Sequence, residues 1–185
     1  MAGPSTTAES ILLATRQAIA ERGTGQLTMS AVASKAAISR PTLYRWFPTK
    51  RDLLAALADY EERRFDTGLR DVIAAVPTPR NQLDAALRYT VGFLGETALP
   101  TPIDLDPAFF LESLAASLGP HIDMLAELLS EALSEIPAVR EGALTGRQVA
   151  ELFLRVAYSL YLVPHPDAEA LLATMRDLAG LGLSV

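Results

Sequence analysis

The sequence predicts an all-α protein, with a small N-terminal helical unit followed by a larger helical body. Alanine and leucine dominate the 185 residues, and runs of alternating β-branched residues are absent, so helical periodicity is the regular pattern that remains. Half of the residues are hydrophobic, which is enough to bury a core in one or two domains. Prolines and glycines gather in short segments between the apolar stretches, where they separate one helix from the next.

The composition excludes several classes of protein. The chain has no cysteine, which excludes a disulfide framework, a cysteine-ligated metal site and a cysteine nucleophile. The first ten residues, MAGPSTTAES, carry no basic segment before an apolar run, so no signal peptide is expected. No stretch reaches the roughly 18 uninterrupted apolar residues that a membrane span requires. We therefore expect a soluble, cytoplasmic protein with no membrane partner.

Charge is distributed unevenly along the chain. The net charge is −6, yet residues 1–51 hold seven basic and two acidic residues, whereas the remainder holds nine basic and twenty acidic residues. A basic head on an acidic body indicates a polyanionic partner for the head alone. Chance segregation of solvated charges is the alternative that the sequence leaves open.

Helix boundaries in the first helix and in the body are predicted from caps, periodicity and prolines. Thr6 and Glu9 have the spacing of a capping box before the first apolar stripe, and Gly23 is suited to the end of that helix. One long helix is then predicted over about 49–76, followed by amphipathic helices at about 80–97, 106–117, 120–136, 145–163 and 167–180. The predicted domains are 1–48 and 49–185.

Two short helices joined by a tight turn are predicted within the head. Thr28 is placed to cap one helix over about 28–35, and Ser39 caps another with Pro41 in its first turn. The second of these helices ends near Phe47, because Pro48 cannot continue it. Such a pair in a basic segment indicates a helix-turn-helix, whose second helix enters the DNA major groove with its N-terminal residues leading.

The side chains of this second helix suit contacts with DNA. Arg40, at the leading end, can pair bidentately with a guanine, and Pro41 and Thr42 can contact base edges. Hydroxyl and cationic side chains further along can bind phosphates. The predicted DNA-binding residues are Thr28, Ser39, Arg40, Pro41, Thr42, Tyr44, Arg45, Trp46 and Lys50.

Two residues of the same helix are assigned to the core of the head. Leu43 and Phe47 are four positions apart and therefore share one helical face. Trp46 stays open between a contact with DNA and a packing role, because a tryptophan between two helices often packs.

This segment resembles the DNA-binding head of the TetR/AcrR family of bacterial transcriptional repressors. The resemblance covers roughly residues 8–55, and the matching positions are Thr28, Val32, Ala33, Ser39, Thr42, Leu43, Tyr44, Phe47, Lys50, Leu53 and Leu54. Two positions depart from the family pattern: Ala37 stands where the turn usually carries glycine, and Trp46 where many members carry histidine. The resemblance implies a ligand-responsive repressor that binds a palindromic operator as a homodimer and is released by a small apolar effector.

The helical body holds the candidates for the effector pocket and the dimer interface. The candidate pocket residues, each equally suited to ordinary core packing, are Tyr89, Phe93, Phe109, Phe110, Leu114, Met124, Leu128 and Tyr158. The resemblance implies that the last two helices pack with those of a second copy. The two apolar stripes that support this are Leu152, Val156, Leu160 and Val163, then Leu171, Leu172, Met175 and Leu178. Closure of the monomer core is the alternative role of both stripes.

Signatures of catalysis are absent from the sequence. Its two histidines, His121 and His165, lie far apart, and no HExxH motif, phosphate-binding loop or Ser-His-Asp arrangement is present. We therefore expect no enzymatic activity, no cofactor and no metal. A helical protein-interaction module with an incidental basic end is the second class that the sequence allows.

Overall fold

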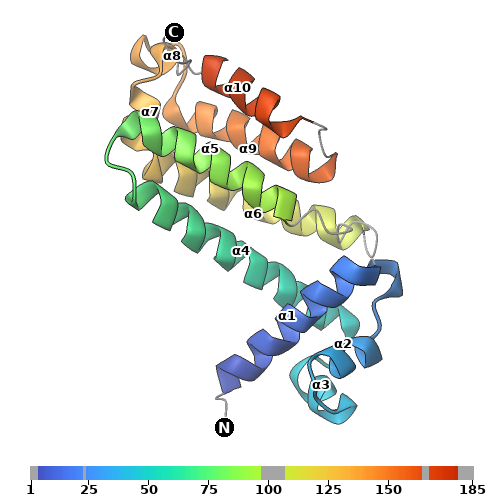
Figure 1. Cartoon of the computed structure of the whole chain (residues 1–185). Coiled ribbons are helices and arrows are strands. Elements are labelled where there is room, and N and C mark those ends of the chain that lie inside the picture. Colours follow the sequence, from blue (N-terminus) through green and yellow to red (C-terminus); the bar gives the residue numbers. More distant parts are fainter. Residues whose placement is uncertain (1–3, 23, 97–106, 164–166, 179–185) are drawn as a thin grey trace. The chain divides into compact units, whose positions relative to one another are not determined.

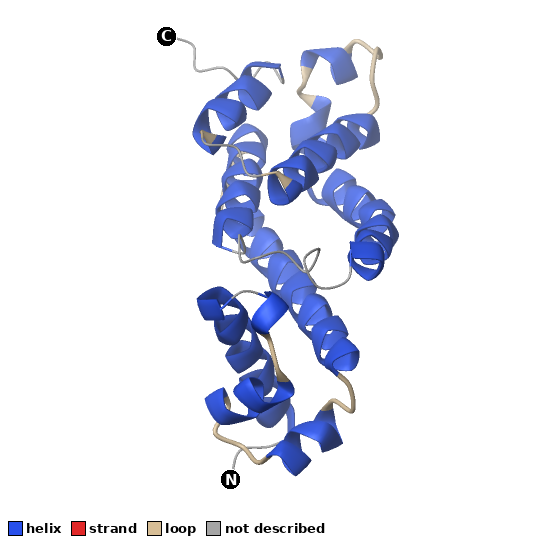
Figure 2. Cartoon of the chain, turned by 90° about the vertical axis from the view of Figure 1, so that its right-hand side faces the viewer, coloured by secondary structure: helices blue, strands red, loops and turns tan. Residues whose placement is uncertain are grey.

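The computed structural model describes residues 4–22, 24–96, 107–163 and 167–178, and these residues form helices and connecting turns with no strand (Figures 1 and 2). The all-α prediction is confirmed. Among these helices, none combines the length and the hydropathy needed to cross a lipid bilayer. In chain order they are α1 (Pro4–Arg22), a 3₁₀ turn (Thr24–Gln26), α2 (Met29–Lys35), α3 (Arg40–Trp46), α4 (Lys50–Ala74), α5 (Pro79–Glu96), α6 (Pro107–Leu128), α7 (Ser130–Ser134), α8 (Pro137–Arg140), α9 (Gly146–Leu162) and α10 (Ala168–Leu178).

The chain divides into two compact units, and the boundary falls within α4. Unit 1 comprises α1 to α3, α4 as far as Arg64, and the start of α6 up to Leu111. Unit 2 comprises the rest of α4 and α6 together with α5 and α7 to α10. The sequence predicts a head that ends at residue 48. The first half of α4 groups with the head because Leu53 and Leu57 are buried in its core.

The core of unit 1 is an apolar cluster shared by α1, α2, α3 and α4. Helix α1 packs against α2, and α2 packs against α3. Helix α1 begins at Pro4, two residues before the predicted cap at Thr6, and Gly23 lies outside the described residues. The buried members of the cluster are Ile11, Leu12, Ala18, Ile19, Leu27, Val32, Ala33, Leu43, Phe47, Leu53 and Leu57.

The turn between α2 and α3 places Ala37 in the left-handed backbone region, with φ 53°. The Ile38 N–H donates to the carbonyl of Ala33 (3.0 Å), and the Ala37 N–H donates to the carbonyl of Ser34 (3.2 Å). These are the two bonds of a Schellman motif, in which the left-handed residue is usually glycine because a Cβ clashes there. The turn therefore forms without glycine, and its strain is concentrated at Ala37.

Substitution of Ala37 by glycine is expected to stabilise unit 1. A left-handed alanine costs about 1–2 kcal/mol, and the extra freedom of glycine in the unfolded chain offsets roughly half of that gain. The expected net gain is therefore about 0.5–1 kcal/mol in the free energy of unfolding. The side chain of Ala37 is exposed, so no buried contact is lost. Urea denaturation measures the change.

The neighbouring alanine provides the matched control for this substitution. Ala36 has φ −75° at the end of α2, where alanine carries no strain. Ala36→Gly is therefore expected to destabilise the unit by at least about 0.5–1 kcal/mol, because Ala36 also packs partly against the core of unit 1. If the free energy of unfolding changes in the same direction in both variants, strain at Ala37 does not limit the stability of the unit.

Helix α4 begins with a reciprocal pair of cap bonds, close to the predicted start of the long helix at residue 49. Thr49 Oγ1 accepts from the backbone N–H of Asp52 (3.1 Å), and Asp52 Oδ2 accepts from the backbone N–H of Thr49 (3.0 Å). Both bonds satisfy N–H groups that have no partner within the helix. The helix then runs without a break to Ala74, and its residues are divided between the two units.

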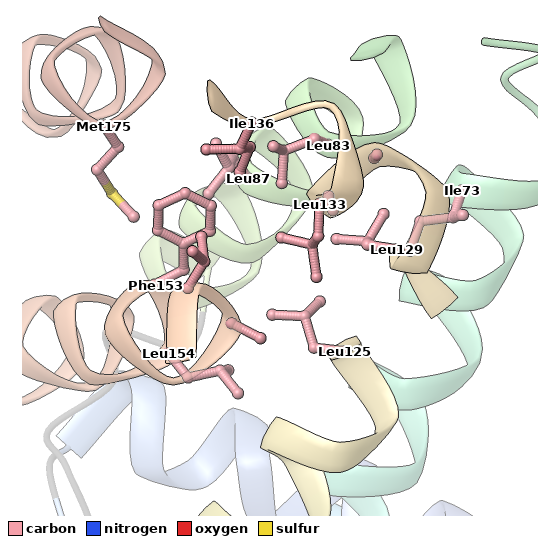
Figure 3. Packing of buried hydrophobic residues seen from close by; sticks show 14 of the residues in the cluster. Ile73, Leu83, Leu87, Leu125, Leu129, Leu133, Ile136, Phe153, Leu154 and Met175 are labelled. Atoms are coloured by element: carbon pink, nitrogen blue, oxygen red, sulfur yellow. The ribbon is translucent and has the colours of Figure 1, made fainter. Parts of the chain in front are cut away.

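Unit 2 packs α5 against α7, α9 and α10 around a second apolar core. Figure 3 shows residues of this core from α4, α5, α6, α7, α9 and α10, with Met175 reaching in from α10. Asp84 of α5 forms an ion pair with Arg176 of α10, and Arg88 donates from Nε to Asp84 (2.9 Å). This hydrogen bond raises the pKa of Arg88. The buried core residues are Leu69, Ile73, Leu83, Ala86, Leu87, Ile122, Leu125, Leu129, Ala132, Leu133, Ile136, Val149, Ala150, Phe153, Leu154 and Met175.

Helix α6 differs from the prediction of two helices over 106–117 and 120–136. It runs from Pro107 to Leu128 with Pro120 in its interior, and α7 follows after Leu129. An interior proline removes one hydrogen bond and costs about 3 kcal/mol. The turn directly after it is anchored by burial of Ile122 and Leu125, and these contacts hold the helix together. The single turn of α8 lies in a segment predicted to be a linker.

Candidate DNA interface and effector site

Ser39 caps the N-terminus of helix α3, as the sequence predicts. Ser39 Oγ accepts from the backbone N–H of Thr42 (3.3 Å) and lies 2.8 Å from Thr42 Oγ1. Pro41 occupies the first turn, where its missing N–H leaves no bond unmade. The Phe47 N–H donates to the carbonyl of Leu43 (2.9 Å) and ends the helix. Local caps thus fix a helix of seven residues.

The two faces of α3 have opposite character. Leu43 has no exposed surface and Phe47 is 8% exposed, so both lie in the core of unit 1 and confirm the packing prediction. Arg40 and Arg45 are exposed on the other face, and Tyr44 is 48% exposed between them. A helix with one face in the core presents the other to a partner.

The cations around α3 are available for an anionic partner. Arg40, Arg45 and Lys50 form no salt bridge within the part of the chain that the structure describes, whereas Lys35 is held by Glu21 at 2.7 Å. Unpaired guanidinium and ammonium groups retain their full charge for phosphates. Thr28 accepts from the backbone N–H of Ala31 (3.1 Å) as the cap of α2, so its side chain already holds a structural bond.

Trp46 packs instead of presenting its indole N–H. The ring lies partly buried against the core of unit 1, and Nε1 has neither exposed surface nor a hydrogen-bond partner. A hydrogen bond from this N–H to a phosphate would require the side chain to move. Of the two roles that the sequence leaves open for Trp46, the geometry favours packing.

Polar contacts within unit 1 tie α1 to α4. Glu61 pairs with Arg64 (3.2 Å) and with Arg16 of α1 (3.7 Å). Tyr60 donates to Glu9 Oε1 (3.5 Å). Burial, and then the charge of Glu9, raise the pKa of Tyr60, so the phenol keeps the proton that it donates. The first half of α4 is therefore fixed to the helix that supports α2 and α3.

Unit 2 contains a cluster of aromatic rings beside a buried histidine. The ring centroid of Phe65 lies 5.7 Å from that of Tyr89, 5.2 Å from that of Phe93 and 6.0 Å from that of His121. Tyr89 and Phe93 are 5.8 Å apart. Gly68 makes this packing possible, because a Cβ there would lie 2.1 Å from the Tyr89 hydroxyl. Tyr89 and Phe93 are predicted pocket residues, whereas Phe65 is an addition from the structure.

His121 links three helices of unit 2 through polar contacts. Its Nδ1 lies 2.8 Å from the hydroxyl of Tyr158 on α9, and its Nε2 lies 3.4 Å from Asp66 Oδ1 on α4. His121 itself is on α6 and is 9% exposed. Tyr158 is a predicted pocket residue, but Asp66 and His121 are not. No sequence spacing relates these three residues, since the fold alone brings them together.

The remaining predicted pocket residues do not form an open pocket. Met124 and Leu128 pack against the core of unit 2, Leu114 is half-buried, and the side chains of Phe109 and Phe110 lie outside the described residues. A cavity of about 20 Å³ in this core has room for about one water molecule. None of the six predicted residues whose side chains the structure describes lines it. Its described lining residues are Leu83, Ala86, Leu87, Thr90, Val91, Leu125, Leu129, Phe153, Leu154, Ala157, Leu160 and Met175.

Helix α9 is apolar on two sides. Phe153, Leu154 and Ala157 are buried in unit 2. Leu152 is 53% exposed and Val163, just beyond the end of α9, is 72% exposed. Both belong to the predicted dimer stripe, and neither is needed to close the monomer core.

Two members of the predicted dimer stripes face the monomer core instead. Leu160 lines the small cavity, and Met175 is 6% exposed in the core cluster. Their helical spacing is correct for a stripe, but spacing does not reveal which neighbour the stripe meets. Leu171 is half-buried, and the side chains of Leu172 and Leu178 lie outside the described residues. Val156, from the first stripe, packs partly against the core.

The arrangement of α2, the Ala37 turn and α3 is a helix-turn-helix with a cationic outer face. Within the described residues, no group of acidic or histidine side chains is arranged to hold a metal ion. These features define a DNA-binding transcription regulator. Residues 11–57 match the family described as bacterial regulatory proteins, tetR family. Residues 11–57 therefore carry the DNA-binding segment of the TetR family of transcriptional regulators.

Individual relatives extend the likeness beyond the head. An uncharacterised HTH-type transcriptional regulator of Mycobacterium tuberculosis is 26% identical over 155 residues, which cover 80% of this chain and 77% of that protein. The TetR family repressor AlkX of Dietzia, implicated in biodegradation of n-alkanes, is 28% identical and superposes with a TM-score of 0.60. The match covers 96% of this chain and 94% of the AlkX chain. The regulator FadR of Bacillus subtilis, solved with stearoyl-CoA, has a TM-score of 0.69 at 20% identity, with 95% and 98% covered.

Proposed function

We propose that this chain is a ligand-responsive repressor that binds a palindromic operator as a homodimer in the cytoplasm. The observation that carries the DNA-binding surface is the outer face of α3, where Arg40, Tyr44 and Arg45 are exposed opposite a buried Leu43. In this proposal Arg40, Pro41 and Thr42 contact bases, while Tyr44, Arg45 and Lys50 contact phosphates. The predicted head at 1–48, together with Lys50 at the start of α4, contacts DNA, and the rest of the predicted body at 49–185 carries dimerisation and sensing.

The salt dependence of DNA binding tests this surface. We expect the full chain to bind random-sequence duplex with an affinity that falls steeply as salt rises, with a slope of about −0.9 for each phosphate contact. Arg45→Ala removes one such contact and reduces the slope by about one. Arg155→Ala is the matched control, because Arg155 pairs with Glu151 on α9 in unit 2. A flat salt profile would instead favour a protein-interaction module.

Dimerisation is proposed at α9 and α10. Leu152 and Val163 supply an apolar surface that the monomer leaves uncovered, and α10 is anchored to its own unit through Met175 and Arg176. A single head buries too little surface to read an operator tightly, whereas two heads about 34–36 Å apart read two half-sites. A pair of α9–α10 faces related by twofold symmetry fits this requirement.

The effector site is proposed at the aromatic cluster of unit 2. The Asp66 contact with His121 lies in unit 2, and the Glu61 contacts lie in unit 1, on the same continuous helix α4. A ligand that displaces Asp66 therefore acts on the helix that carries the head. It releases the operator only if it binds the DNA-incompetent arrangement more tightly than the competent one.

Two neighbours support a repressor that senses an apolar compound. AlkX is a repressor implicated in n-alkane biodegradation, and FadR of B. subtilis was solved with stearoyl-CoA. The rings of Phe65, Tyr89 and Phe93 supply an apolar surface for such a compound. Stearoyl-CoA and a long n-alkane therefore belong in the first thermal-shift screen, in which a bound ligand raises the melting temperature.

A further inference from the structure

The aromatic cluster of unit 2 carries a carboxylate. Asp66 follows Phe65 directly in α4, and its Oδ1 is buried against His121. The whole side chain is 35% exposed, so the part of Asp66 turned away from His121 retains accessible surface. Phe65, Tyr89 and Phe93 lie in mutual contact. The ring of His121 lies 6.0 Å from that of Phe65 and its Nε2 lies 3.4 Å from Asp66 Oδ1, so His121 connects the carboxylate to the aromatic cluster.

Asp66 brings an acidic group to the site. Its Oδ1 lies 3.4 Å from His121 Nε2, and His121 Nδ1 lies 2.8 Å from the hydroxyl of Tyr158 on α9. An ionised carboxylate favours a cation placed near it.

The charge of the surrounding unit has the same sign. Unit 2 contains fourteen acidic and seven basic residues. Such a unit attracts cations and repels anions over distances comparable to the Debye length, about 8–10 Å in ordinary buffers. The faces of phenyl and phenol rings are also the negative part of their quadrupole and favour a cation placed over them.

We infer that the ligand of this site is a lipophilic cation of the arylalkylammonium class. The inference rests on the proposed effector role of the aromatic cluster and adds the charge of the compound. Its alkyl and aryl groups pack on Phe65, Tyr89 and Phe93, while its ammonium lies between these rings and the accessible part of Asp66. An anionic group placed in the position of this ammonium meets repulsion from the carboxylate, the rings and the acidic unit.

Three compounds of similar shape test the charge preference. The probes are benzyltrimethylammonium, its neutral isostere neopentylbenzene, and the anion 4-tert-butylbenzoate. Calorimetric titration of the full chain is expected to show that the cation binds at least about tenfold more tightly than the neutral isostere. The anion is expected to bind most weakly. Failure of all three to bind at millimolar concentration, or tightest binding by the neutral compound or the anion, would overturn the inference.

Two substitutions locate the preference in the cluster. Asp66→Asn keeps the shape of the side chain, and it is expected to remove most of the tenfold preference while leaving the affinity for neopentylbenzene unchanged. Phe93→Leu is expected to weaken binding of the cation by about 3- to 10-fold through loss of one ring. Asp71→Asn is the control, since Asp71 is an exposed carboxylate on the same helix. An equal loss in the Asp66 and Asp71 variants would overturn the placement.

A parallel operator-release assay separates this inference from the proposed function. Release of operator DNA by benzyltrimethylammonium, absent in Asp66→Asn, supports both. Binding that depends on Asp66 but leaves operator affinity unchanged supports the cation site and contradicts its role as an effector site. Release by 4-tert-butylbenzoate or stearoyl-CoA, with no response to the cation, supports an effector function and overturns the charge assignment.

Discussion

Replacement of Arg40 by alanine is expected to weaken operator binding by about 1–3 kcal/mol, which corresponds to roughly 5- to 150-fold in Kd. Arg40 leads α3, is exposed and has no salt-bridge partner within the described residues, so its guanidinium is free to pair with a guanine. The loss of sequence preference should be confined to the one base pair of each half-site that Arg40 contacts. A gel-shift titration against an operator library substituted at single positions measures both the affinity and the relaxed preference.

Lys50→Ala supplies the contrasting result. Lys50 is the first residue of α4 and is assigned to phosphate, so its removal should weaken binding about equally on all sequences and reduce the salt slope by about one. If both variants bind the operator as the unsubstituted chain does, then α3 is not the recognition helix. If Arg40→Ala weakens binding to all DNA sequences equally, Arg40 contacts phosphate instead of a base.

Replacement of Leu152 by glutamate is expected to convert the proposed dimer into monomers and to weaken operator binding by about 100-fold or more, because two linked heads gain roughly 10²–10⁴ in avidity over one. Leu152 is 53% exposed on α9, so the folded monomer tolerates a charge there, whereas a buried twofold interface does not. Light scattering coupled to size exclusion gives the mass, and circular dichroism confirms the fold.

An equivalent leucine outside the proposed interface controls for the added charge. Leu144 is 40% exposed in the turn before α9, and Leu144→Glu introduces the same carboxylate. That variant is expected to remain dimeric and to bind operator normally. A dimeric Leu152→Glu variant would place the interface elsewhere, and monomers in both variants would indicate a general effect of negative charge.

The head was predictable because its signals are local. Ser39, Pro41 and Pro48 determine the limits of α3 within a few residues of one another, and a cap bond depends on little beyond its own turn. The roles of Leu43 and Phe47 followed from helical spacing alone. The sequence comparison also marks Ala37 as unusual, because related turns usually have glycine at this position. The structure shows the reason: Ala37 has a positive φ, which glycine adopts more easily than alanine.

The body was less predictable because its contacts join distant residues. Pro120 predicted a break in a helix that tertiary packing of Ile122 and Leu125 keeps whole. Met175 has the spacing of an interface residue, but it is buried within its own unit. Spacing along a helix specifies a face and leaves the identity of the neighbour to the fold.

The polar part of the candidate effector site carried no recognisable sequence pattern. Asp66 lies in a charged stretch of α4 that is typical of a solvated surface, and His121 follows an interior proline in an apolar helix. Only the packing of α4, α6 and α9 brings them to Tyr158. Sites of this kind require coordinates, since each residue has an ordinary local explanation.

The position of Trp46 has a spectroscopic consequence. It is the only tryptophan in the chain, and it packs against the core of unit 1 with its indole nitrogen shielded. Intrinsic tryptophan emission therefore originates entirely in the DNA-binding head, while the candidate effector site is in unit 2. Any change in that emission when a compound binds Asp66 and its aromatic neighbours reports a change at the head, with no extrinsic dye and no engineered fluorophore.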